Sequence, residues 1–374
     1  MVNKDRIIAE FIEMVSVPCP SKGEREEAEL IMSKLRALGL DPVMDEAHLK
    51  TGGNCGNVWV YIKGNVPTAP VLFFEAHMDS VAPATGTHVV RRDGVLYSDG
   101  TTTLGGDDKV GVASMLEAVR ALQEDNLPHG DLQLCFTISE EIGCLGVVNM
   151  DKSWIKADFG YCLDADGEIG GITYAAPKLY DIDVTITGKA AHAGMEPEKG
   201  INAIMLAAAA ISKLPAYGRI DAETTMNIGI FQAGQGKNIV CPEAKFTIDM
   251  RSLDVAKLEK LKDDTLALLE QEVVAQGGQF AYEITDSCPA VCVPQDHACI
   301  QLAERAAKSI GRKPQLLTSG GCSDGNFLCG YDLPCAVLAT GMSNIHTTSE
   351  FLKEDDLYAT AQWMYAIIKE AAAQ

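Results

Sequence analysis

The sequence predicts an α/β protein with a mainly parallel central sheet, interrupted by an inserted α+β domain of ferredoxin-like topology. Two observations lead to this prediction. Between about residues 39 and 176, strand-like apolar runs alternate with an amphipathic helical segment, a pattern typical of parallel strands joined by crossovers. From about residue 178, strict alternation of apolar and polar residues indicates a sheet with one solvated face, and the later elements suggest the order βαββαβ.

The chain is expected to begin with two helices. The apolar residues of the first, between Ile7 and Val15, fall on one stripe. A second helix is predicted over about residues 24–38 and should end at Gly39, a natural C-terminal cap. A third helix is indicated by apolar residues at spacings of three and four, namely Val112, Met115, Leu116, Val119 and Leu122.

The inserted domain is predicted over residues 178–288, between two parts of the main domain at 1–177 and 289–374. In its first strand, the apolar residues that alternate with polar ones are Tyr180, Ile182, Val184 and Ile186. A helix should follow, with an apolar stripe of Ile201, Ile204, Met205, Ala208 and Ile211. The remaining expected elements are strands near 225–231, 244–250 and 279–285 and a helix near 255–274. After the insertion, a helix near 296–310 and an apolar run at 333–339 return to the first pattern.

Composition indicates a globular protein and argues against several classes of partner. The 374 residues are 47% hydrophobic, enough for a large core, and their formal charge of −21 has the wrong sign for binding nucleic acid. No apolar stretch approaches the roughly 20 residues that cross a bilayer. The N-terminal residues lack the apolar block of a secretion signal, so a cytoplasmic location without a membrane partner is expected. The 12 cysteines contain no CxxC pair and are expected to be buried free thiols.

Four apolar runs lead to residue types that bind metals. The runs beginning at residues 72, 132, 159 and 335 are followed by His77 and Asp79, by Glu140 and Glu141, by Asp164, and by a loop with His346. A lone histidine at a strand end is more often a hydrogen-bonded core or loop residue. However, the carboxyl ends of parallel strands open into one crevice, and several charges gathered there need a cation to offset them.

Five residues are the predicted metal ligands: His77, Asp107, Glu141, Asp164 and His346. Mixed histidine and carboxylate ligands suit zinc, with manganese or cobalt as substitutes. Two ions roughly 3.5–4 Å apart need a bridging ligand with two oxygens, and Asp107 is the candidate. Because Asp107 and Asp108 directly precede a helix, either could instead be its N-cap.

The adjacent carboxylates Glu140 and Glu141 indicate two different tasks. Two carboxylates repel each other in a low-dielectric crevice, so we expect Glu141 to bind metal and Glu140 to act as the general base. The alternative is a solvated pair that caps the next helix. Asp79 is expected to orient the imidazole of His77 through the nitrogen that does not bind metal, the alternative being an exposed turn residue.

Six motifs, in order along the chain, resemble the co-catalytic zinc peptidase family that includes peptidase T, carboxypeptidase G and the aminoacylases. They are residues 77–79, 106–111, 139–143, 163–164 and 191–194, and His346. The segments 100–109 and 319–326 are most similar to peptidase T and its relatives. The resemblance therefore spans nearly the whole chain.

The resemblance implies a zinc-peptidase catalytic domain with an inserted lid domain and two zinc ions per chain. It assigns His77 and Asp164 to one ion, Glu141 and His346 to the other, and Asp107 to the bridge. It implies that metal-bound hydroxide attacks the amide bond of a short peptide, with Glu140 as base. It also implies lid contacts with substrate from His192, Arg251 and Asn238, of which His192 would stabilise the oxyanion and Arg251 would pair with a carboxylate. The lid could also mediate a homodimer.

Two departures from peptidase T leave strict tripeptide specificity open. Peptidase T usually has His-Pro-Gly where this chain has His192 followed by alanine and glycine, and the surroundings of His346 differ. A tripeptide aminopeptidase-like activity is the leading hypothesis. A carboxypeptidase or N-acyl amino acid deacylase would use the same metals with a differently shaped pocket. A catalytically idle metal-binding scaffold is the alternative from a different class.

Overall fold

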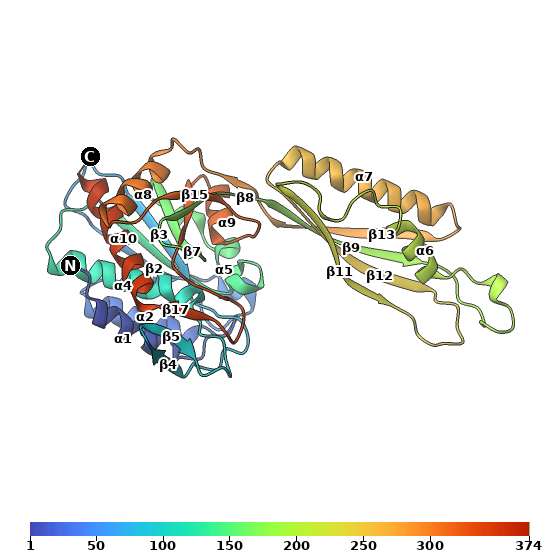
Figure 1. The fold of residues 1–374 in the computed structure, drawn as a ribbon, viewed down its shortest axis with the longest axis horizontal. Helices are drawn as coiled ribbons and strands as arrows, with labels where there is room; N and C mark the ends of the chain where they lie inside the picture. Colours follow the sequence, from blue (N-terminus) through green and yellow to red (C-terminus); the bar gives the residue numbers. More distant parts are fainter. Residues whose placement is uncertain (374) are drawn as a thin grey trace. The chain divides into compact units, whose positions relative to one another are not determined.

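The computed structural model describes residues 1–373, which form two compact units (Figure 1). Unit 1 comprises Met1–Ala175, Cys292–Thr318 and the chain from Ser323, and unit 2 comprises Ala176–Val291 and Ser319–Cys322. The predicted boundaries lie at 177/178 and 288/289. The short return of the chain to unit 2 at 319–322 has no counterpart among the predicted boundaries.

Unit 1 is built on a nine-stranded sheet whose central strands are parallel. Strand β3 (Leu72–His77) pairs in parallel with β6 (Leu132–Thr137) and β7 (Phe159–Ala165), and β7 pairs in parallel with β16 (Cys335–Ala339). All residues of β3 and β6 are buried, which explains their continuous apolar runs. The outer strands are β1 (Val43–Met44), β2 (Val58–Ile62), β8 (Gly171–Ala176), β14 (Val291–Cys292) and β15 (Gln315–Thr318).

Helices cover both faces of this sheet (Figure 1). Helix α4 (Gly106–Glu124) packs against β3 and β7, and its layer also contains α1 (Lys4–Val15), α8 (Ala298–Ser309) and α10 (Glu354–Ala372). Helix α9 (Asp324–Gly330) packs against β7 and β16, beside α5 (Leu145–Asn149). Gly111 of α4 adjoins Ala76, whereas Gly325 of α9 adjoins Cys162, the register partner of Glu75. Because successive strand residues point to opposite faces, α4 and α9 lie on opposite sides of the sheet.

Smaller elements complete unit 1. They are the helices α2 (Arg25–Ala37) and α3 (His48–Thr51), the 3-10 turns η1 (Glu140–Ile142) and η2 (Lys152–Trp154), and a three-stranded sheet of β17 (Phe351–Lys353), β5 (Val95–Ser98) and β4 (Val89–Arg92). The turn η1 directly follows β6, and it carries the two neighbouring glutamates that follow this strand.

Unit 2 is a five-stranded antiparallel sheet with two helices. Its strands, in order across the sheet, are β10 (Gly218–Arg219), β11 (Thr224–Ala233), β12 (Glu243–Ser252), β9 (Lys178–Thr187) and β13 (Gln279–Cys288). Helices α6 (Ala203–Ile211) and α7 (Val255–Val274) pack against β9 and β12, and a 3-10 turn, η3 (Pro197–Lys199), precedes α6. The chain order β9, α6, β11, β12, α7, β13 is the predicted βαββαβ, and together with the parallel sheet of unit 1 it confirms the predicted fold class.

The predicted apolar stripe of α6 is wrong. The structure buries the other side of the helix, formed by Ala203, Leu206, Ala207 and Ala210. Ile204 and Met205, assigned to the predicted stripe, are 37% and 64% exposed. Because residues 203–211 include no polar side chain, periodicity cannot distinguish the two faces of this helix.

The cysteine prediction needs one correction. Cys288, at the end of β13, and Cys322, in the returning segment of unit 2, form a disulfide with their Cα atoms 6.5 Å apart. The other ten cysteines are free thiols, and of these only Cys292 is exposed. The two cysteines are 34 residues apart in the sequence, and this spacing does not indicate a disulfide. They come close together only because residues 319–322 return to unit 2.

Candidate metal centre

All five predicted metal ligands come together in unit 1, in two adjoining groups. The ligand atoms of His77, Asp107 and Asp164 lie within 4.8 Å of one another, and so do those of Asp107, Glu141 and His346. Asp107 belongs to both groups. The parallel strands β3 and β7 deliver His77 and Asp164 to the same edge of the sheet, and the turn η1 after β6 delivers Glu141.

Asp107 directs one carboxylate oxygen toward each group. Its Oδ1 lies 2.9 Å from His77 Nε2, and its Oδ2 lies 3.1 Å from His346 Nε2. Asp107 and Asp108 have non-helical backbone angles, so the regular part of α4 begins after them. Asp108 takes the capping position there, since its Oδ1 accepts the backbone N–H of Gly111 at 3.1 Å. The N-cap alternative thus describes Asp108, whereas the Asp107 carboxylate faces two imidazoles.

The imidazole of His77 is oriented through its second nitrogen. His77 Nδ1 lies 3.0 Å from the backbone carbonyl oxygen of Asp79 and 3.5 Å from Asp79 Oδ1. His77 Nε2 faces Asp107 and also lies 3.7 Å from Asp164 Oδ1. A hydrogen bond from Nδ1 to the carbonyl leaves Nε2 available as a metal ligand, the arrangement common at histidine–metal sites.

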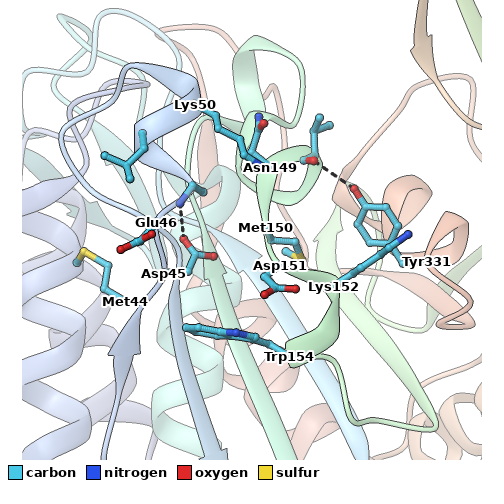
Figure 2. A pocket seen from close by; sticks show the side chains of 13 residues that line it. Met44, Asp45, Glu46, Lys50, Asn149, Met150, Asp151, Lys152, Trp154 and Tyr331 are labelled. Carbon is cyan, nitrogen blue, oxygen red and sulfur yellow. Dashed lines mark hydrogen bonds between the residues drawn. The ribbon is translucent and has the colours of Figure 1, made fainter.

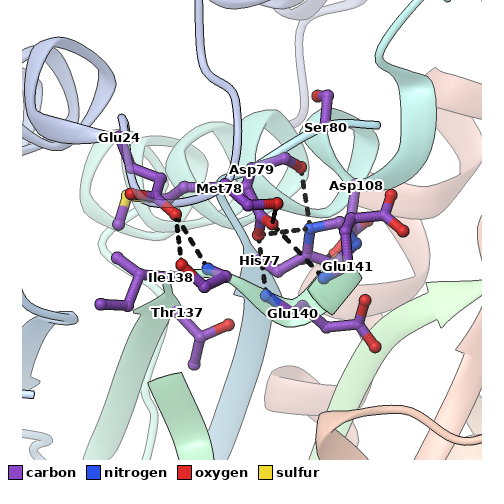
Figure 3. Close-up of polar contacts among 12 residues, drawn as sticks. Glu24, His77, Met78, Asp79, Ser80, Asp108, Thr137, Ile138, Glu140 and Glu141 are labelled. Carbon is purple, nitrogen blue, oxygen red and sulfur yellow. Dashed lines mark hydrogen bonds and ion pairs between the residues drawn. The ribbon is translucent and has the colours of Figure 1, made fainter. Parts of the chain in front are cut away.

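The Asp79 carboxylate mainly holds the turn η1 (Figure 3). It accepts hydrogen bonds from the Ser21 hydroxyl at 2.6 Å and from the backbone N–H groups of Glu140 at 2.9 Å and Glu141 at 3.3 Å. Asp79 is fully buried and not an exposed turn residue. It therefore links the strand end that carries His77 to the turn that carries the two glutamates.

In the group of Asp107, Glu141 and His346, one carboxylate oxygen lacks a hydrogen-bond donor. His346 Nε2 lies 3.1 Å from Glu141 Oε2, while Glu141 Oε1 is buried without any hydrogen-bond partner. A buried carboxylate oxygen without a partner is costly, and a cation between it and the imidazole would remove this cost. The donor set, imidazole nitrogen and carboxylate oxygen, fits a divalent ion of the zinc type.

The pKa shifts of these residues reflect an excess of carboxylates at the centre. Contacts with Asp107 and Glu141 raise the pKa of His346 to about 10. Burial lowers the pKa of His77, but contacts with Asp107, Asp164 and Asp79 outweigh it and raise the pKa well above its ordinary value. Burial raises the pKa of Asp164 to about 7, although His77 opposes this rise. Protons on the imidazoles thus balance carboxylates that a cation could balance instead.

Glu140 belongs to neither of these two groups. Its backbone is held by Asp79, and its Oε1 accepts a hydrogen bond from the Cys144 thiol at 3.4 Å. Burial raises the pKa of Glu140, and the nearby carboxylates of Asp164 and Asp324 raise it further. The Glu140 carboxylate is not one of the proposed ligands, yet it lies near them, which is the position expected of a group that transfers protons.

Several supporting residues were not predicted. Glu350 accepts the N–H groups of Gly105 at 2.9 Å and Asp107 at 3.1 Å, which fixes the loop that carries the shared carboxylate. Lys109 is buried, and its ammonium donates to the carbonyl of Met78 and to the Ser80 hydroxyl. Glu24 accepts the N–H and hydroxyl of Ser139, just before η1 (Figure 3). Lys109 and Glu350 lie close to predicted ligands in sequence, whereas no local signal marks Glu24.

The three predicted lid residues lie in unit 2. His192 is exposed, and its Nδ1 accepts the N–H groups of Gly194 and Met195 at 3.2 and 3.1 Å. The backbone carbonyl of Asn238 accepts the N–H of Ala193 at 3.0 Å, so the segments of His192 and Asn238 adjoin. Arg251 pairs with Asp249 at 2.8 Å and donates to the carbonyl of Gly320 at 3.1 Å. Their role in binding substrate stays a prediction.

A separate cavity of about 760 Å³ in unit 1 contains none of the predicted site residues. Figure 2 shows it between the segments 44–50 and 148–154, with Tyr331 at one side. The Tyr331 hydroxyl donates to the carbonyl of Val147 at 3.1 Å, which joins the loop after α9 to α5. Nothing in this lining resembles the gathered imidazoles and carboxylates of the metal centre.

Known proteins resemble this chain over its full length. Residues 73–370 match the model of peptidase family M20/M25/M40. The chain is 41% identical over 372 residues to the uncharacterized protein YqjE of Bacillus subtilis strain 168, with 100% of both chains covered. The crystal structure of aminopeptidase PepT from Bacillus cereus ATCC 10987 is 40% identical, with a TM-score of 0.94 and 99% of each chain covered. A tripeptidase structure from Staphylococcus aureus is 33% identical, with a TM-score of 0.97 and 100% of each chain covered.

Proposed function

The chain belongs to peptidase family M20/M25/M40 and is a metal-dependent hydrolase, and from this premise we propose that it hydrolyses an amide bond of short peptides, with a tripeptide aminopeptidase-like activity. The predicted resemblance to peptidase T-like enzymes is confirmed by the comparisons. The single observation that carries the proposal is Asp107, whose two carboxylate oxygens face the imidazoles of His77 and His346.

We propose that the centre holds two divalent ions, with zinc as the metal and manganese or cobalt as substitutes. His77 and Asp164 would hold one ion, Glu141 and His346 the other, and Asp107 would bridge them, as the two adjoining ligand groups support. When bound, the ions would supply the Lewis acidity that acidifies water and polarises the peptide carbonyl.

The remaining steps depend on the chain's own side chains. Glu140 takes a proton from the attacking water and delivers it to the leaving amine, as a partly buried carboxylate with a raised pKa is suited to do. Asp79 fixes the positions of Glu140 and His77 relative to each other, because it contacts the turn that carries Glu140 and the strand end that carries His77.

In this proposal unit 2 acts as the lid and as the surface of a homodimer. Arg251 would pair with a substrate carboxylate, His192 would donate to the developing oxyanion, and Asn238 would add a further contact. The exposed neighbours Ile204 and Met205 of α6 are the apolar residues that we propose for the dimer contact. Sedimentation of the protein and of a Met205→Glu variant would test the dimer, which should dissociate in the variant.

We propose two partners for the chain, a short peptide as substrate and a second copy of the chain in a homodimer. None of the helices in the described part of the chain has the length and apolarity needed to cross a membrane. The net charge of −21 disfavours nucleic acid. A cytoplasmic location stays a prediction.

Replacing Glu140 by glutamine tests the mechanism. The turnover number for a tripeptide should fall by about 10²- to 10⁴-fold, the usual contribution of a general base. The two ions of the centre should stay bound, because Glu140 lies outside the two ligand groups that share Asp107. Glu46→Gln is a matched control, since Glu46 is exposed and lines the separate cavity. Near wild-type turnover in Glu140→Gln would remove Glu140 from the mechanism.

A substrate panel tests the reaction class. Free tripeptides, N-blocked peptides and acyl amino acids should be compared in the metal-loaded protein. We expect turnover of the free tripeptides. Exclusive turnover of N-blocked substrates would instead assign a carboxypeptidase or deacylase activity, and no turnover with any of these metals would favour an idle scaffold.

A further inference from the structure

A third group of potential ligands adjoins the metal centre. Ligand atoms of Glu140, Cys144 and Asp324 lie within 4.8 Å of one another. None of the three is among the five predicted metal ligands. All three belong to unit 1, since Glu140 and Cys144 lie on the turn after β6, and Asp324 begins α9.

Asp324 is the unusual member of this group. Its side chain is 1% exposed, and neither carboxylate oxygen makes a hydrogen bond, although Thr137 and Cys144 lie beside it. Glu75 lies close by and is fully buried. Its Oε1 accepts a hydrogen bond from the Thr137 hydroxyl, whereas its Oε2 has no partner. Two buried carboxylates without adequate partners are costly unless a proton or a cation neutralises them.

The turn between Glu140 and Cys144 sets the thiol against the glutamate. The backbone N–H of Cys144 donates to the carbonyl of Glu140 at 2.8 Å, and Leu145 N–H donates to Ser139 at 3.0 Å. On this closed turn, Cys144 Sγ lies 3.4 Å from Glu140 Oε1 and is almost completely buried. The thiol and two carboxylates therefore face a common point from two separate segments.

We propose that Glu140, Cys144 and Asp324 form a third, inhibitory site for a divalent cation of the zinc or cobalt type. One sulfur and two oxygens are an acceptable donor set for such ions, and the separations of the ligand atoms suit a common ion. On coordination the Cys144 thiol releases its proton to solvent, and the ion takes its place between the thiolate and the carboxylates.

Binding of the third cation would inhibit hydrolysis because both need the carboxylate of Glu140. A carboxylate that holds a cation no longer accepts a proton from water, so hydrolysis stops while the five other ligands stay occupied. This consequence rests on the proposed function, whereas binding of the ion does not. The two parts can therefore be tested separately.

Cobalt tests the binding. The five predicted ligands of the metal centre supply only nitrogen and oxygen, so a sulfur-to-cobalt charge-transfer absorption must come from a cysteine. In protein that already holds two cobalt ions, this band should appear with the third equivalent and be absent from Cys144→Ser. Cys292→Ser is the matched control, because Cys292 is the exposed free thiol, and it should keep the band. Absence of the band, or its persistence in Cys144→Ser, would overturn the site.

A second measurement needs no variant of the site. Because Cys144 is buried, its thiol reacts with an alkylating agent only through local opening, so the rate of its alkylation is followed by peptide mass spectrometry over a long incubation. A third equivalent of zinc should slow the alkylation of Cys144 and leave the rate at the exposed Cys292 unchanged. An equal rate at Cys144 with two and three equivalents would contradict the proposal. The result stands even if substitutions at Cys144 disturb folding.

Inhibition tests the consequence. Excess zinc should reduce tripeptide turnover at least tenfold, and Cys144→Ser should raise the half-inhibitory zinc concentration by about tenfold or more, since even the loss of a group behind a ligand weakens metal binding 10- to 100-fold. Cys292→Ser should match the wild type. The same zinc sensitivity in Cys144→Ser would overturn the inhibitory role. A sulfur-to-cobalt band without any inhibition would also overturn the inhibitory role. In that case the turnover of Glu140→Gln would show whether the proposed role of Glu140 in hydrolysis has failed.

Discussion

Replacing Glu27 by glutamine should stabilise unit 1 at neutral and alkaline pH. Glu27 lies in the first turn of α2, its side chain is fully buried, and neither of its carboxylate oxygens has a hydrogen-bond partner. Burial raises the pKa of Glu27 from 4.5 to about 7, even though the buried ammonium of Lys109 attracts its charge. The carboxylate is thus ionised above pH 7 at a cost to the folded state.

The sign and size of this cost follow from the pKa. A carboxyl group with a higher pKa in the folded state holds its proton more tightly there, so ionisation favours unfolding. The cost is absent below pH 4.5, grows up to pH 7 and is complete above it. At 1.36 kcal/mol per pH unit it amounts to about 3 kcal/mol. Because glutamine cannot ionise, the variant should exceed the wild type by roughly 1 kcal/mol near pH 5.5 and about 3 kcal/mol near pH 8.

Urea unfolding followed by tryptophan fluorescence measures this difference. All three tryptophans, Trp59, Trp154 and Trp363, lie in unit 1, so the signal reports that unit. The metal-free protein should be used throughout, since bound ions add their own stability. Glu26→Gln is the matched control: it removes the same charge from the same helical turn at an exposed side chain, and it should change stability by less than about 0.5 kcal/mol.

Two results would refute the reasoning about Glu27. One is a stability difference between Glu27→Gln and the wild type that does not grow as the pH rises from 5.5 to 8. The other is an equal and equally pH-dependent effect of Glu26→Gln, which would assign the effect to the charge of the first helical turn and not to burial.

Three further outcomes are expected. Asp107→Asn should reduce bound metal, counted by atomic emission, from two ions per chain to one or fewer and lower turnover by orders of magnitude; two tightly held ions in this variant would exclude Asp107 as the bridge. Chelation should abolish turnover and lower the melting temperature of unit 1, and zinc, manganese or cobalt should restore both; full activity of the apoprotein would contradict a metal enzyme. Arg251→Lys should raise KM for peptides with a free C-terminal carboxylate more than for their amides, because lysine lacks the forked donors; an equal rise for both would argue against a carboxylate contact.

The edge of the sheet that carries the candidate metal centre could be predicted because its strands are buried on both faces. The residues of β3 and β6 read as continuous apolar runs, and such runs mark parallel strands whose ends converge. From this pattern the sequence predicts that His77, Glu141 and Asp164 lie close together, and their ligand atoms do so in the structure. The sequence alone leaves two roles open for Asp107, since a carboxylate before a helix is also a good cap, and in the structure its neighbour Asp108 takes the capping position.

Other features depend on contacts that leave no local pattern. Strand β17 pairs with β5, more than 250 residues earlier, and both are too short to show a clear period. Glu24 and Glu350 bind backbone N–H groups, which any sequence offers, so only the fold shows their targets. The buried face of α6 could not be chosen because all of its residues are apolar.

The entry and exit strands of unit 2 bear on how such enzymes diversify. The chain enters on β9 and leaves on β13, which are antiparallel neighbours with Leu179 opposite Cys288. The two ends of the main segment of unit 2, Ala176–Val291, are thus about one strand spacing apart, about 5 Å. A cassette with adjacent ends can be acquired, lost or exchanged without stretching the parent chain. In the proposed function, replacement of this cassette would change the peptide preference, while the five proposed metal ligands, all of which lie in unit 1, would be inherited intact.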